Sequence, residues 1–425
     1  MKDLLSMSQS ELAELKEELW QEFQEFKDRG LSLNMARGKP SPEQLDLSMP
    51  MLDVLNARSS CLTDSGMDCR NYGQLEGIPE ARQLFGQYMG IAPEETFVAG
   101  SSSLTFMFQC LTNAMFGGVY GTEKPWKDSG TVKFLCPVPG YDRHFTMCEF
   151  LGIEMINISL GPDGPDMDEI ERLVAEDASI KGIWCVPKFS NPLGAVYSDE
   201  TVRRFARLKP KAPDFRIFWD NAYGMHYVYQ DVPLLNLLDE CKKAGNPHMV
   251  YLFGSTSKFT FPGAGVSFLG ASQENIAFLS KQMSFQAISW DKLNMLRHVR
   301  FLKDMETIKK LMDGHARLLR PRFDAVLNTL DQELKDWDAG TWTKPEGGYF
   351  ITFKAKPGCA KRIVQLCKQA GVTLTDAGAT HPYHKDPEDA YIRLAPSFPS
   401  VTEITQATQL FCIAAKISTL ESVMK

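Results

Sequence analysis

The sequence lacks the features of secreted and membrane proteins. None of its ten cysteines forms a C-x-x-C pair, and they are spread singly along the chain. This spacing argues against a disulfide framework or a zinc site and favours reduced thiols in a cytosol. The first residues are acidic and polar without an apolar segment, so we expect no signal peptide. No apolar run approaches the length that spans a bilayer, and we therefore expect a cytoplasmic protein without membrane contact.

The sequence also lacks an excess of basic residues. Its formal net charge of −7 argues against nucleic-acid binding as the main task. There is no internal repeat and no low-complexity segment, and the apolar and charged fractions are ordinary for a globular enzyme. A chain of 425 residues is too long for one simple core, so we expect two lobes.

One lysine lies in an unusual stretch. Apolar residues 249–253 indicate a buried strand, and Gly254-Ser255-Thr256-Ser257-Lys258 follows it, closed by Pro262-Gly263. A lysine at a strand end, among apolar residues, readily loses its proton and can form a Schiff base with an aldehyde cofactor. The serines beside it can hold the phosphate of such a cofactor. The alternative is a solvated loop lysine.

A second stretch has the form of an anion site. Phe97-Val98-Ala99 indicates a short strand, followed by Gly100-Ser101-Ser102-Ser103 and an apolar helix over 104–116. A strand, a turn of small residues and a helix N-terminus present unpaired N–H groups and a helix dipole to an anion. Serine is also a common N-cap, so the stretch could serve only to start the helix.

Strands and helices alternate through the middle of the chain, which predicts an α/β lobe with a mostly parallel sheet. Ligands of such sheets gather outside the carboxyl ends of the strands. Polar residues follow several of these ends, among them Tyr141, Asn191 and Asp220. The expected strands cover 132–136, 182–186, 216–219, 249–253 and 266–270, and the expected helices cover 79–88, 104–116, 166–176 and 199–208.

The two ends of the chain have other patterns. Ser8-Gln9-Ser10-Glu11 resembles a capping box, and apolar residues then recur at helical spacing up to Gly30. Arg37-Gly38-Lys39-Pro40-Ser41-Pro42 is irregular and basic, and could either face an anionic substrate or be a linker. Residues 276–334 are helical in pattern, as expected for a helix that bridges two lobes. A second lobe is indicated by strands at 342–354 and 390–395 and helices at 362–370 and 402–419.

Four short motifs stand at expected strand ends. In chain order they are Asn191-Pro192-Leu193-Gly194, Asp220-Asn221-Ala222-Tyr223, Ser255-Thr256-Ser257-Lys258 and Tyr391-Ile392-Arg393. They resemble the N-P-x-G, D-x-x-Y, S-x-S-K and final arginine motifs of the class I aminotransferases, which are fold type I pyridoxal-phosphate enzymes. The resemblance extends from the Gly38 region to Arg393. It implies an α/β fold: a large lobe with a mostly parallel sheet over residues 48–300, and a smaller α/β lobe built from both termini, 1–47 and 301–425.

The resemblance implies a role for each matching residue. Lys258 would hold pyridoxal 5′-phosphate as a Schiff base and then move the alpha proton of the substrate. Asp220 would pair with the pyridine nitrogen and keep it protonated, so that the ring accepts electrons. Tyr223 and Asn191 would hydrogen-bond the phenolic oxygen of the ring. From the residues alone, Asp220 could be a cap, Asn191 a turn residue and Tyr223 a core residue.

The resemblance also implies the rest of the cofactor site. Tyr141 would stack on the ring, although a packing role is open from the sequence. Tyr72 would reach the phosphate in a neighbouring subunit, which implies a homodimer with shared active sites. Small residues of two stretches would surround the phosphate, namely Gly100, Ser101, Ser102, Ser255 and Ser257.

Substrate carboxylates need cations and N–H groups. Arg393 would clamp the alpha-carboxylate with two parallel N–H bonds, and Gly38 would offer its backbone N–H; a surface ion pair is the alternative for Arg393. Many family members carry a phosphate-binding arginine eight residues after the lysine, where this chain has Val266. This departure and the Gly-Ser-Ser-Ser-Leu, Arg-Gly-Lys-Pro and Arg-Asn-Tyr-Gly stretches resemble the bacterial subgroup Ic aspartate aminotransferases. Candidates for a distal carboxylate, by charge and expected placement, are Arg37, Lys39, Arg143 and His144.

Taken with the resemblance, these residues predict a homodimeric aminotransferase, and we favour an aspartate transaminase. It would convert aspartate and 2-oxoglutarate to oxaloacetate and glutamate by a ping-pong cycle, with amino acids and 2-oxo acids as partners and no metal. Transfer from alanine or an aromatic amino acid, or carbon–sulfur lyase chemistry, is the first alternative. The second is a ligand-sensing transcription regulator, but the first 30 residues indicate one acidic helix without a recognition helix.

Overall fold

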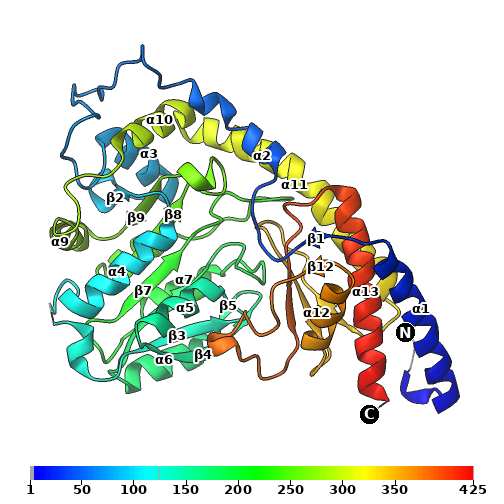
Figure 1. Cartoon of the computed structure of the whole chain (residues 1–425). Helices are drawn as coiled ribbons and strands as arrows, with labels where there is room; N and C mark the ends of the chain where they lie inside the picture. The colour runs from blue at the N-terminus through cyan, green and yellow to red at the C-terminus, as the bar shows by residue number, and fades with distance from the viewer. Residues whose placement is uncertain (1–3, 123, 425) are drawn as a thin grey trace.

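The computed structural model describes residues 4–122 and 124–424. At its centre is an eight-stranded sheet with the strand order β2-β9-β8-β7-β6-β3-β4-β5 (Figure 1). The pairings from β8 through β4 are parallel, and antiparallel pairings lie toward both edges. The strands are β2 (Thr96–Ala99), β3 (Lys133–Val138), β4 (Glu154–Gly161), β5 (Gly164–Pro165), β6 (Ile180–Cys185), β7 (Arg216–Asp220), β8 (Val250–Ser255) and β9 (Ser267–Gly270).

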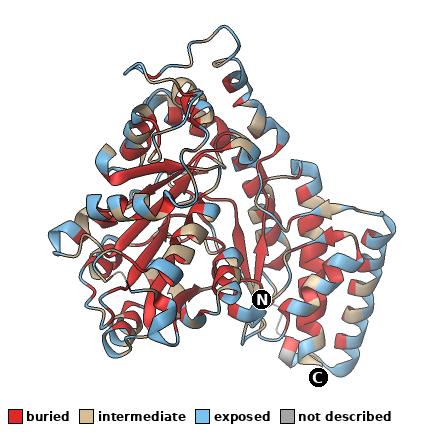
Figure 2. Ribbon diagram, turned by 60° about the vertical axis from the view of Figure 1, so that its left-hand side comes forward, coloured by how far each residue is buried: buried red, intermediate tan, exposed pale blue. Residues whose placement is uncertain are grey.

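Helices cover both faces of this sheet. One buried cluster joins the strands to α4 (Ser103–Gly117), α5 (Asp142–Phe150) and α9 (Gln273–Met283), and another joins them to α6 (Met167–Glu176), α7 (Asp199–Ala206) and α8 (Leu237–Lys243). Neighbouring strand residues alternate between the clusters, with Phe218 in the first and Trp219 in the second. Because both faces are covered, the central strands are buried along their length (Figure 2).

The two ends of the chain form a smaller α/β part. β11 (Ile351–Ala355) pairs antiparallel with β10 (Gly340–Trp342) and with β13 (Tyr391–Leu394). β1 (Leu33–Asn34) pairs in parallel with β12 (Val372–Thr373), which joins the N-terminal segment to the C-terminal third of the chain. The remaining helices of this part are α1 (Gln9–Asp28), α12 (Ala360–Gln369) and α13 (Val401–Val423), which lie together on one side of the molecule in Figure 1.

Helices near the boundary connect the two parts. α3 (Pro79–Met89) packs against β2 and α10 (Lys292–Leu302), while the long α11 (Met305–Leu334) contacts α3, α2 (Pro42–Asp46) and α13. α11 therefore spans from the large sheet to the smaller part, as the helical pattern predicted. Its N-terminus is capped by Asp304, whose side chain accepts the N–H of Thr307 at 2.8 Å.

Some predictions of secondary structure are confirmed and others are wrong. The capping box is present: Ser8 and Glu11 each accept a backbone N–H of the other. α5 (Asp142–Phe150) was not among the expected helices. Residues 342–354, expected as one strand, contain the end of β10 and the start of β11, because the glycine pair Gly347-Gly348 lies in the connection between them.

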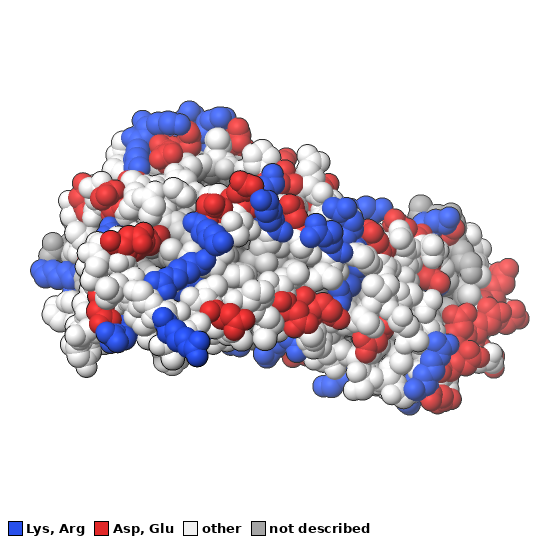
Figure 3. All heavy atoms as spheres, turned by 90° about the horizontal axis from the view of Figure 1, so that it is seen from above, with Lys and Arg blue, Asp and Glu red and all other residues white. Residues whose placement is uncertain are grey.

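Acidic side chains gather at the end of the molecule where the chain begins. Figure 3 shows this end, and α1 contributes Glu14, Glu17, Glu18, Glu22 and Glu25 to it.

Among the described helices, none is both long and apolar enough to cross a membrane. Within residues 4–122 and 124–424, no group of three or more His, Cys, Asp or Glu side chains is placed to hold a metal ion.

Candidate active site

A cavity of about 130 Å³ lies at the carboxyl ends of β6, β7 and β8, beside the start of α4. Loops that are far apart in the sequence meet there because parallel strands end at the same edge of the sheet. The cavity contains members of three of the four motifs. The predicted site residues that line it are Ser102, Tyr141, Asn191, Asp220, Tyr223, Ser255, Ser257 and Lys258.

The amine of Lys258 is held inside this cavity. Its Nζ donates a hydrogen bond to the carbonyl oxygen of Gly38 at 2.9 Å. Burial lowers the pKa of the amine from 10.5 to about 8; the positive charge of Arg393 adds to the effect, and the charge of Asp220 opposes it. An amine with a lowered pKa is more often neutral near pH 7, and the neutral form is the nucleophile.

The turn that carries Lys258 is closed by a threonine. The hydroxyl of Thr256 accepts the N–H of Val266 at 2.9 Å, and the N–H of Thr256 donates to the carbonyl of Val266 at 2.8 Å. His298 of α10 lies 3.1 Å from the same hydroxyl. These contacts fix the loop between β8 and β9 under the lysine.

One side-chain oxygen of Asp220, which lines the cavity, has no hydrogen-bond partner within the part of the chain that the structure describes. Its side chain is buried, and Oδ2 lies 3.0 Å from Nε2 of His144. The His144 ring is itself stacked on Trp184, with a centroid distance of 4.3 Å and an angle of 9° between the planes. Oδ1 of Asp220 has no hydrogen-bond partner among the described residues. A buried carboxylate oxygen in this state favours a ligand that offers a donor or a positive charge.

The expectation that His144 could bind a distal carboxylate is wrong. His144 is 1% exposed, because α5 turns its ring inward against Asp220 and Trp184. The other three candidates, Arg37, Lys39 and Arg143, are exposed. The amine of Lys39 lies 3.7 Å from the centre of the Phe398 ring.

Arg393 of β13 points into the site rather than to the surface. Its Nη1 donates to Oδ1 of Asn191 at 3.1 Å and approaches Asp142 at 3.3 Å. Its Nη2 donates to the carbonyl of Ala36 at 3.2 Å and to the hydroxyl of Thr375 at 3.1 Å. The side chain is buried, so a surface ion pair does not describe it. The arginine thus joins the 191 loop to the N-terminal segment.

The two stretches expected to surround a phosphate lie together. The hydroxyl of Ser257 donates to the carbonyl of Ser101 at 3.4 Å and lies 3.1 Å from the hydroxyl of Ser255. Ser102 caps α4 by accepting the N–H of Leu104 at 3.2 Å. Gly100 has a φ of +61°, which an L-residue rarely adopts, and it lets the chain turn sharply into the helix.

Three further residues were expected at the site, namely Tyr141, Tyr72 and Gly38, and the structure places each of them differently. Tyr141 lies beside His144, with ring centroids 5.0 Å apart, and burial raises the pKa of its hydroxyl to about 12. Tyr72 is 76% exposed and does not line the cavity. Gly38 packs so closely on Phe350 that a Cβ atom would lie 2.6 Å from its ring. The structure brings the carbonyl of Gly38 to Lys258, while the prediction concerned its N–H.

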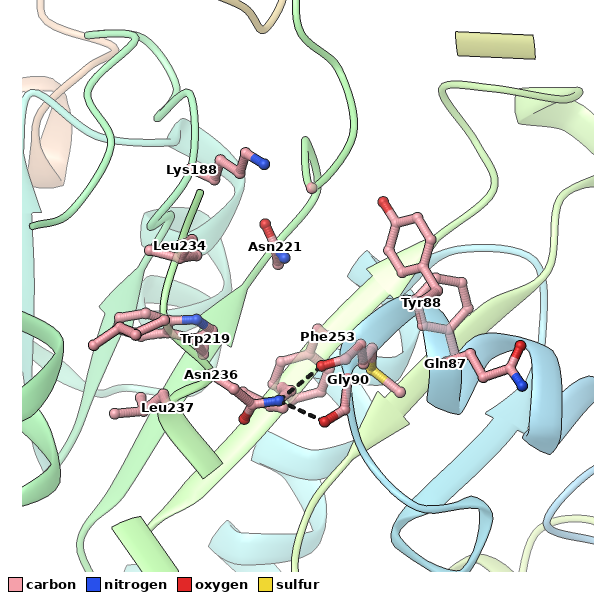
Figure 4. A pocket seen from close by; sticks show the side chains of 15 residues that line it. Gln87, Tyr88, Gly90, Lys188, Trp219, Asn221, Leu234, Asn236, Leu237 and Phe253 are labelled. Carbon is pink, nitrogen blue, oxygen red and sulfur yellow. Dashed lines mark hydrogen bonds between the residues drawn. The ribbon is translucent and has the colours of Figure 1, made fainter. Parts of the chain in front are cut away.

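A larger cavity, of about 280 Å³, does not contain Lys258. It lies between the end of α3, the ends of β7 and β8, and the segment before α8 (Figure 4). Asn236 closes one side by donating to the carbonyls of Met89 and Gly90, both at 2.9 Å. Its lysine, Lys188, is paired with Asp231 at 2.8 Å. The chemistry of the side chains therefore favours the smaller cavity as the active site.

A family model described as aspartate amino-transferase matches residues 7–425. The chain belongs to the aspartate aminotransferase family. An aspartate aminotransferase of Corynebacterium glutamicum is 41% identical over 392 residues, which are 92% of this chain and 90% of that protein. The crystal structure of an aspartate transaminase from Corynebacterium glutamicum matches with a TM-score of 0.96 and 38% identity, over 99% of both chains.

More distant structures share the fold of this aminotransferase. One is the alpha-aminoadipate aminotransferase of Thermus thermophilus, complexed with N-(5′-phosphopyridoxyl)-L-leucine, with a TM-score of 0.72 and 20% identity over 93% of this chain and 95% of that one. The predicted resemblance to the fold type I aminotransferases is therefore confirmed. Pyridoxal 5′-phosphate is the cofactor of this enzyme.

The pKa of Lys258 predicts how the cofactor-free aminotransferase takes up pyridoxal phosphate. We expect the rate of uptake to rise with pH and to level off above an apparent pKa of about 8, because only the neutral amine attacks an aldehyde. Replacing Arg393 by methionine should shift this midpoint upward, since a nearby positive charge is removed. Uptake followed by absorbance at several pH values tests this, and a midpoint that does not differ between the two proteins would contradict it.

Proposed function

We propose that this aminotransferase moves the amino group of aspartate to 2-oxoglutarate, giving oxaloacetate and glutamate in a ping-pong cycle. The observation that carries the proposal is that Lys258 and Asp220 line one cavity together with Asn191, to which Arg393 donates a hydrogen bond. It is supported by the relatives from Corynebacterium glutamicum, which are an aspartate aminotransferase and an aspartate transaminase. We favour Arg37, Lys39 and Arg143 as the remaining candidates for the distal carboxylate of aspartate.

The proposed cofactor site fits the chemistry of pyridoxal phosphate. Lys258 would carry the aldehyde carbon, and the free Oδ1 of Asp220 would accept the N–H of the pyridine ring. His144 would hold the other oxygen of Asp220 in place. When bound, the cofactor supplies an electron-accepting ring that stabilises the charge left by the departing alpha proton. Tyr223 and Asn191 would face the phenolic oxygen, and Tyr141 would cover the ring.

The phosphate would be held without the arginine that many relatives use. Val266 is buried and apolar, so it provides no charge. Hydroxyl groups and the N-terminus of α4 would instead meet the phosphate, because unpaired N–H groups and the helix dipole favour an anion there. The residues in this proposed role are Gly100, Ser101, Ser102, Ser255 and Ser257.

Arg393 would bind the alpha-carboxylate of both substrates. Its guanidinium is buried and already faces the site from β13. We expect Arg393→Ala to cost roughly 2–5 kcal/mol of transition-state binding, seen as higher KM for both aspartate and 2-oxoglutarate. Arg362→Ala is the control, because Arg362 pairs with Glu421 between α12 and α13. An unchanged KM in steady-state assays of Arg393→Ala would remove this residue from the substrate site.

We also propose that the enzyme is a homodimer whose subunits share their active sites. Tyr72 lies outside the cavity of its own chain, as a residue that reaches a neighbouring subunit would. Phe285 and Ile288 are also exposed, and large exposed apolar side chains often mark interfaces. Mixing Lys258→Ala subunits with Tyr72→Ala subunits should restore activity if the tyrosine acts across the interface. No gain over either variant alone would argue against sharing.

We also propose the boundaries of two domains and a cytoplasmic location for the protein. We favour a large cofactor-binding domain over residues 48–300, with residues 1–47 and 301–425 forming the small domain. The parallel pairing of β1 with β12 supports this, because it ties the N-terminal segment to the C-terminal part. The ten cysteines are free, and all but Cys61 are buried, which supports a reducing, cytoplasmic location.

The half-reaction with aspartate tests the proposed activity. Purified protein loaded with pyridoxal phosphate should lose its yellow absorbance when aspartate is added and regain it with 2-oxoglutarate. Alanine and tyrosine serve as comparisons at the same concentration. A much faster loss of absorbance with alanine or tyrosine than with aspartate would overturn the assignment of the donor.

A further inference from the structure

A buried hydrogen-bond network holds the backbone at Lys258. The hydroxyl of Tyr349 donates to the carbonyl oxygen of Lys258 at 3.3 Å. Nε2 of His315 lies 3.3 Å from the carbonyl oxygen of Phe259. Nε2 of Gln44 lies 3.1 Å from the Tyr349 hydroxyl and 3.1 Å from Nδ1 of His315. Gln44, His315 and Tyr349 are all at most 1% exposed, so these bonds are shielded from water.

One assignment of the protons gives each donor in this network an acceptor. The amide of Gln44 has two N–H groups, one for Tyr349 and one for His315. His315 then carries its own proton on Nε2 and donates it to the carbonyl of Phe259. Burial lowers the pKa of His315 to about 4, so the ring is neutral near pH 7. The remaining oxygen of Gln44 accepts the N–H of Ser41 at 3.1 Å.

The network joins the lysine to three separate parts of the chain. Gln44 belongs to α2, His315 to α11, and Tyr349 to the connection before β11. α2 follows shortly after Gly38, whose carbonyl oxygen accepts a hydrogen bond from the amine of Lys258. The hydroxyl of Ser48, from the same segment, donates to the carbonyl of Phe259 at 3.0 Å. One N-terminal segment therefore contacts Lys258 at its amine and, through Tyr349, at its backbone.

We propose that Gln44, Tyr349 and His315 are positioning residues that aim the amine of Lys258. The proposal rests on the proposed role of Lys258 as the residue that holds the cofactor and moves a proton. Such an amine must stay oriented after it is released from the cofactor, and small displacements of a reacting group slow proton transfer strongly. Because Gln44 and Gly38 share a segment, the position of that segment also sets the direction of the lysine.

Variants that remove the donors of one side chain at a time test this role. Tyr349→Phe deletes one hydroxyl and keeps the ring, and Gln44→Met keeps the length of the side chain without its donors. We expect both to load pyridoxal phosphate and to bind aspartate with little change in KM. The rate of absorbance loss with aspartate should fall on the order of tenfold. The isotope effect with alpha-deuterated aspartate should increase, because proton transfer becomes the slower step.

The double variant with both Gln44→Met and Tyr349→Phe tests whether Gln44 and Tyr349 act together. If Gln44 acts through Tyr349, the combined change should slow proton transfer by much less than the product of the two single effects. Tyr229→Phe is the matched control, since its hydroxyl donates to Asp324 at 2.6 Å and lies outside the network. We expect this control to keep the wild-type rate and isotope effect, even if it unfolds at a lower temperature.

The outcomes separate this inference from the proposed function. Wild-type rates and isotope effects in both Tyr349→Phe and Gln44→Met would overturn the positioning role while leaving the role of Lys258 intact. The same slowing in Tyr229→Phe would also overturn it, because the effect would then be general. Failure of the wild-type protein to lose absorbance with any amino acid would instead refute the proposed function.

Discussion

Lys258→Ala is expected to abolish transamination, lowering turnover by at least about 10⁴-fold. Alanine can neither hold the cofactor covalently nor move the alpha proton, so both functions proposed for Lys258 are lost together. The absorbance of the lysine-bound cofactor should disappear as well. Steady-state assays and absorbance spectra of the purified variant measure both effects. The substitution removes a buried amine whose hydrogen bond is to one carbonyl, so we expect the protein still to fold.

Lys188→Ala is the control for this change. Lys188 is buried, but it lies in the larger cavity and pairs with Asp231, whose side chain is 53% exposed. We expect this variant to keep the absorbance of the bound cofactor and most of its turnover. Retained absorbance at the same wavelength in Lys258→Ala would show that another lysine carries the cofactor.

Asp220→Asn is expected to lower turnover by about 10²–10³-fold while the cofactor still binds. An amide has the shape of the carboxylate but lacks the charge that would keep the pyridine nitrogen protonated. The cofactor-free protein should not lose thermal stability, because Oδ1 of Asp220 is buried there without a partner. Single-turnover rates with aspartate and thermal unfolding of the cofactor-free protein measure these two effects.

Asp214→Asn is the control for this change, and we expect it to lower stability while turnover is kept. Asp214 is buried and pairs with Lys181 at 2.7 Å, away from the cavity. Its loss should lower the unfolding temperature, because a buried lysine is left unpaired, while turnover of the folded enzyme is kept. Equal turnover in Asp220→Asn and the wild-type protein would remove Asp220 from the proposed site.

The parts of the site that could be predicted from the sequence are those fixed by strand ends. Asp220 ends a strand with a clear apolar run, Asn191 and Lys258 follow two others, and parallel strands bring such positions to one edge. The resemblance to a family then added the expected role of each residue. Six strands of the sheet, the helices α4, α6 and α7, and the bridging helix were predictable from their apolar patterns, whereas β4, β5, α5 and α8 were not expected.

Other features depend on contacts that no local pattern specifies. The inward turn of His144 follows from how α5 packs on Trp184, so charge alone suggested the wrong role. Gln44 and Tyr349 lie far apart in the sequence, Tyr349 in a stretch expected as a strand and Gln44 in one for which no element was expected, and only the folded chain joins them to Lys258. The glycines at 347–348 gave a signal for a break, which should have divided the stretch 342–354 into β10 and β11.

The most direct test of the account is to identify the residue that carries the cofactor. The loaded enzyme would be reduced with borohydride, which fixes the pyridoxyl group to its lysine, then digested and analysed by mass spectrometry. The account predicts one modified peptide, with the added mass on Lys258. A pyridoxyl group on any other lysine, or none on Lys258, would contradict it.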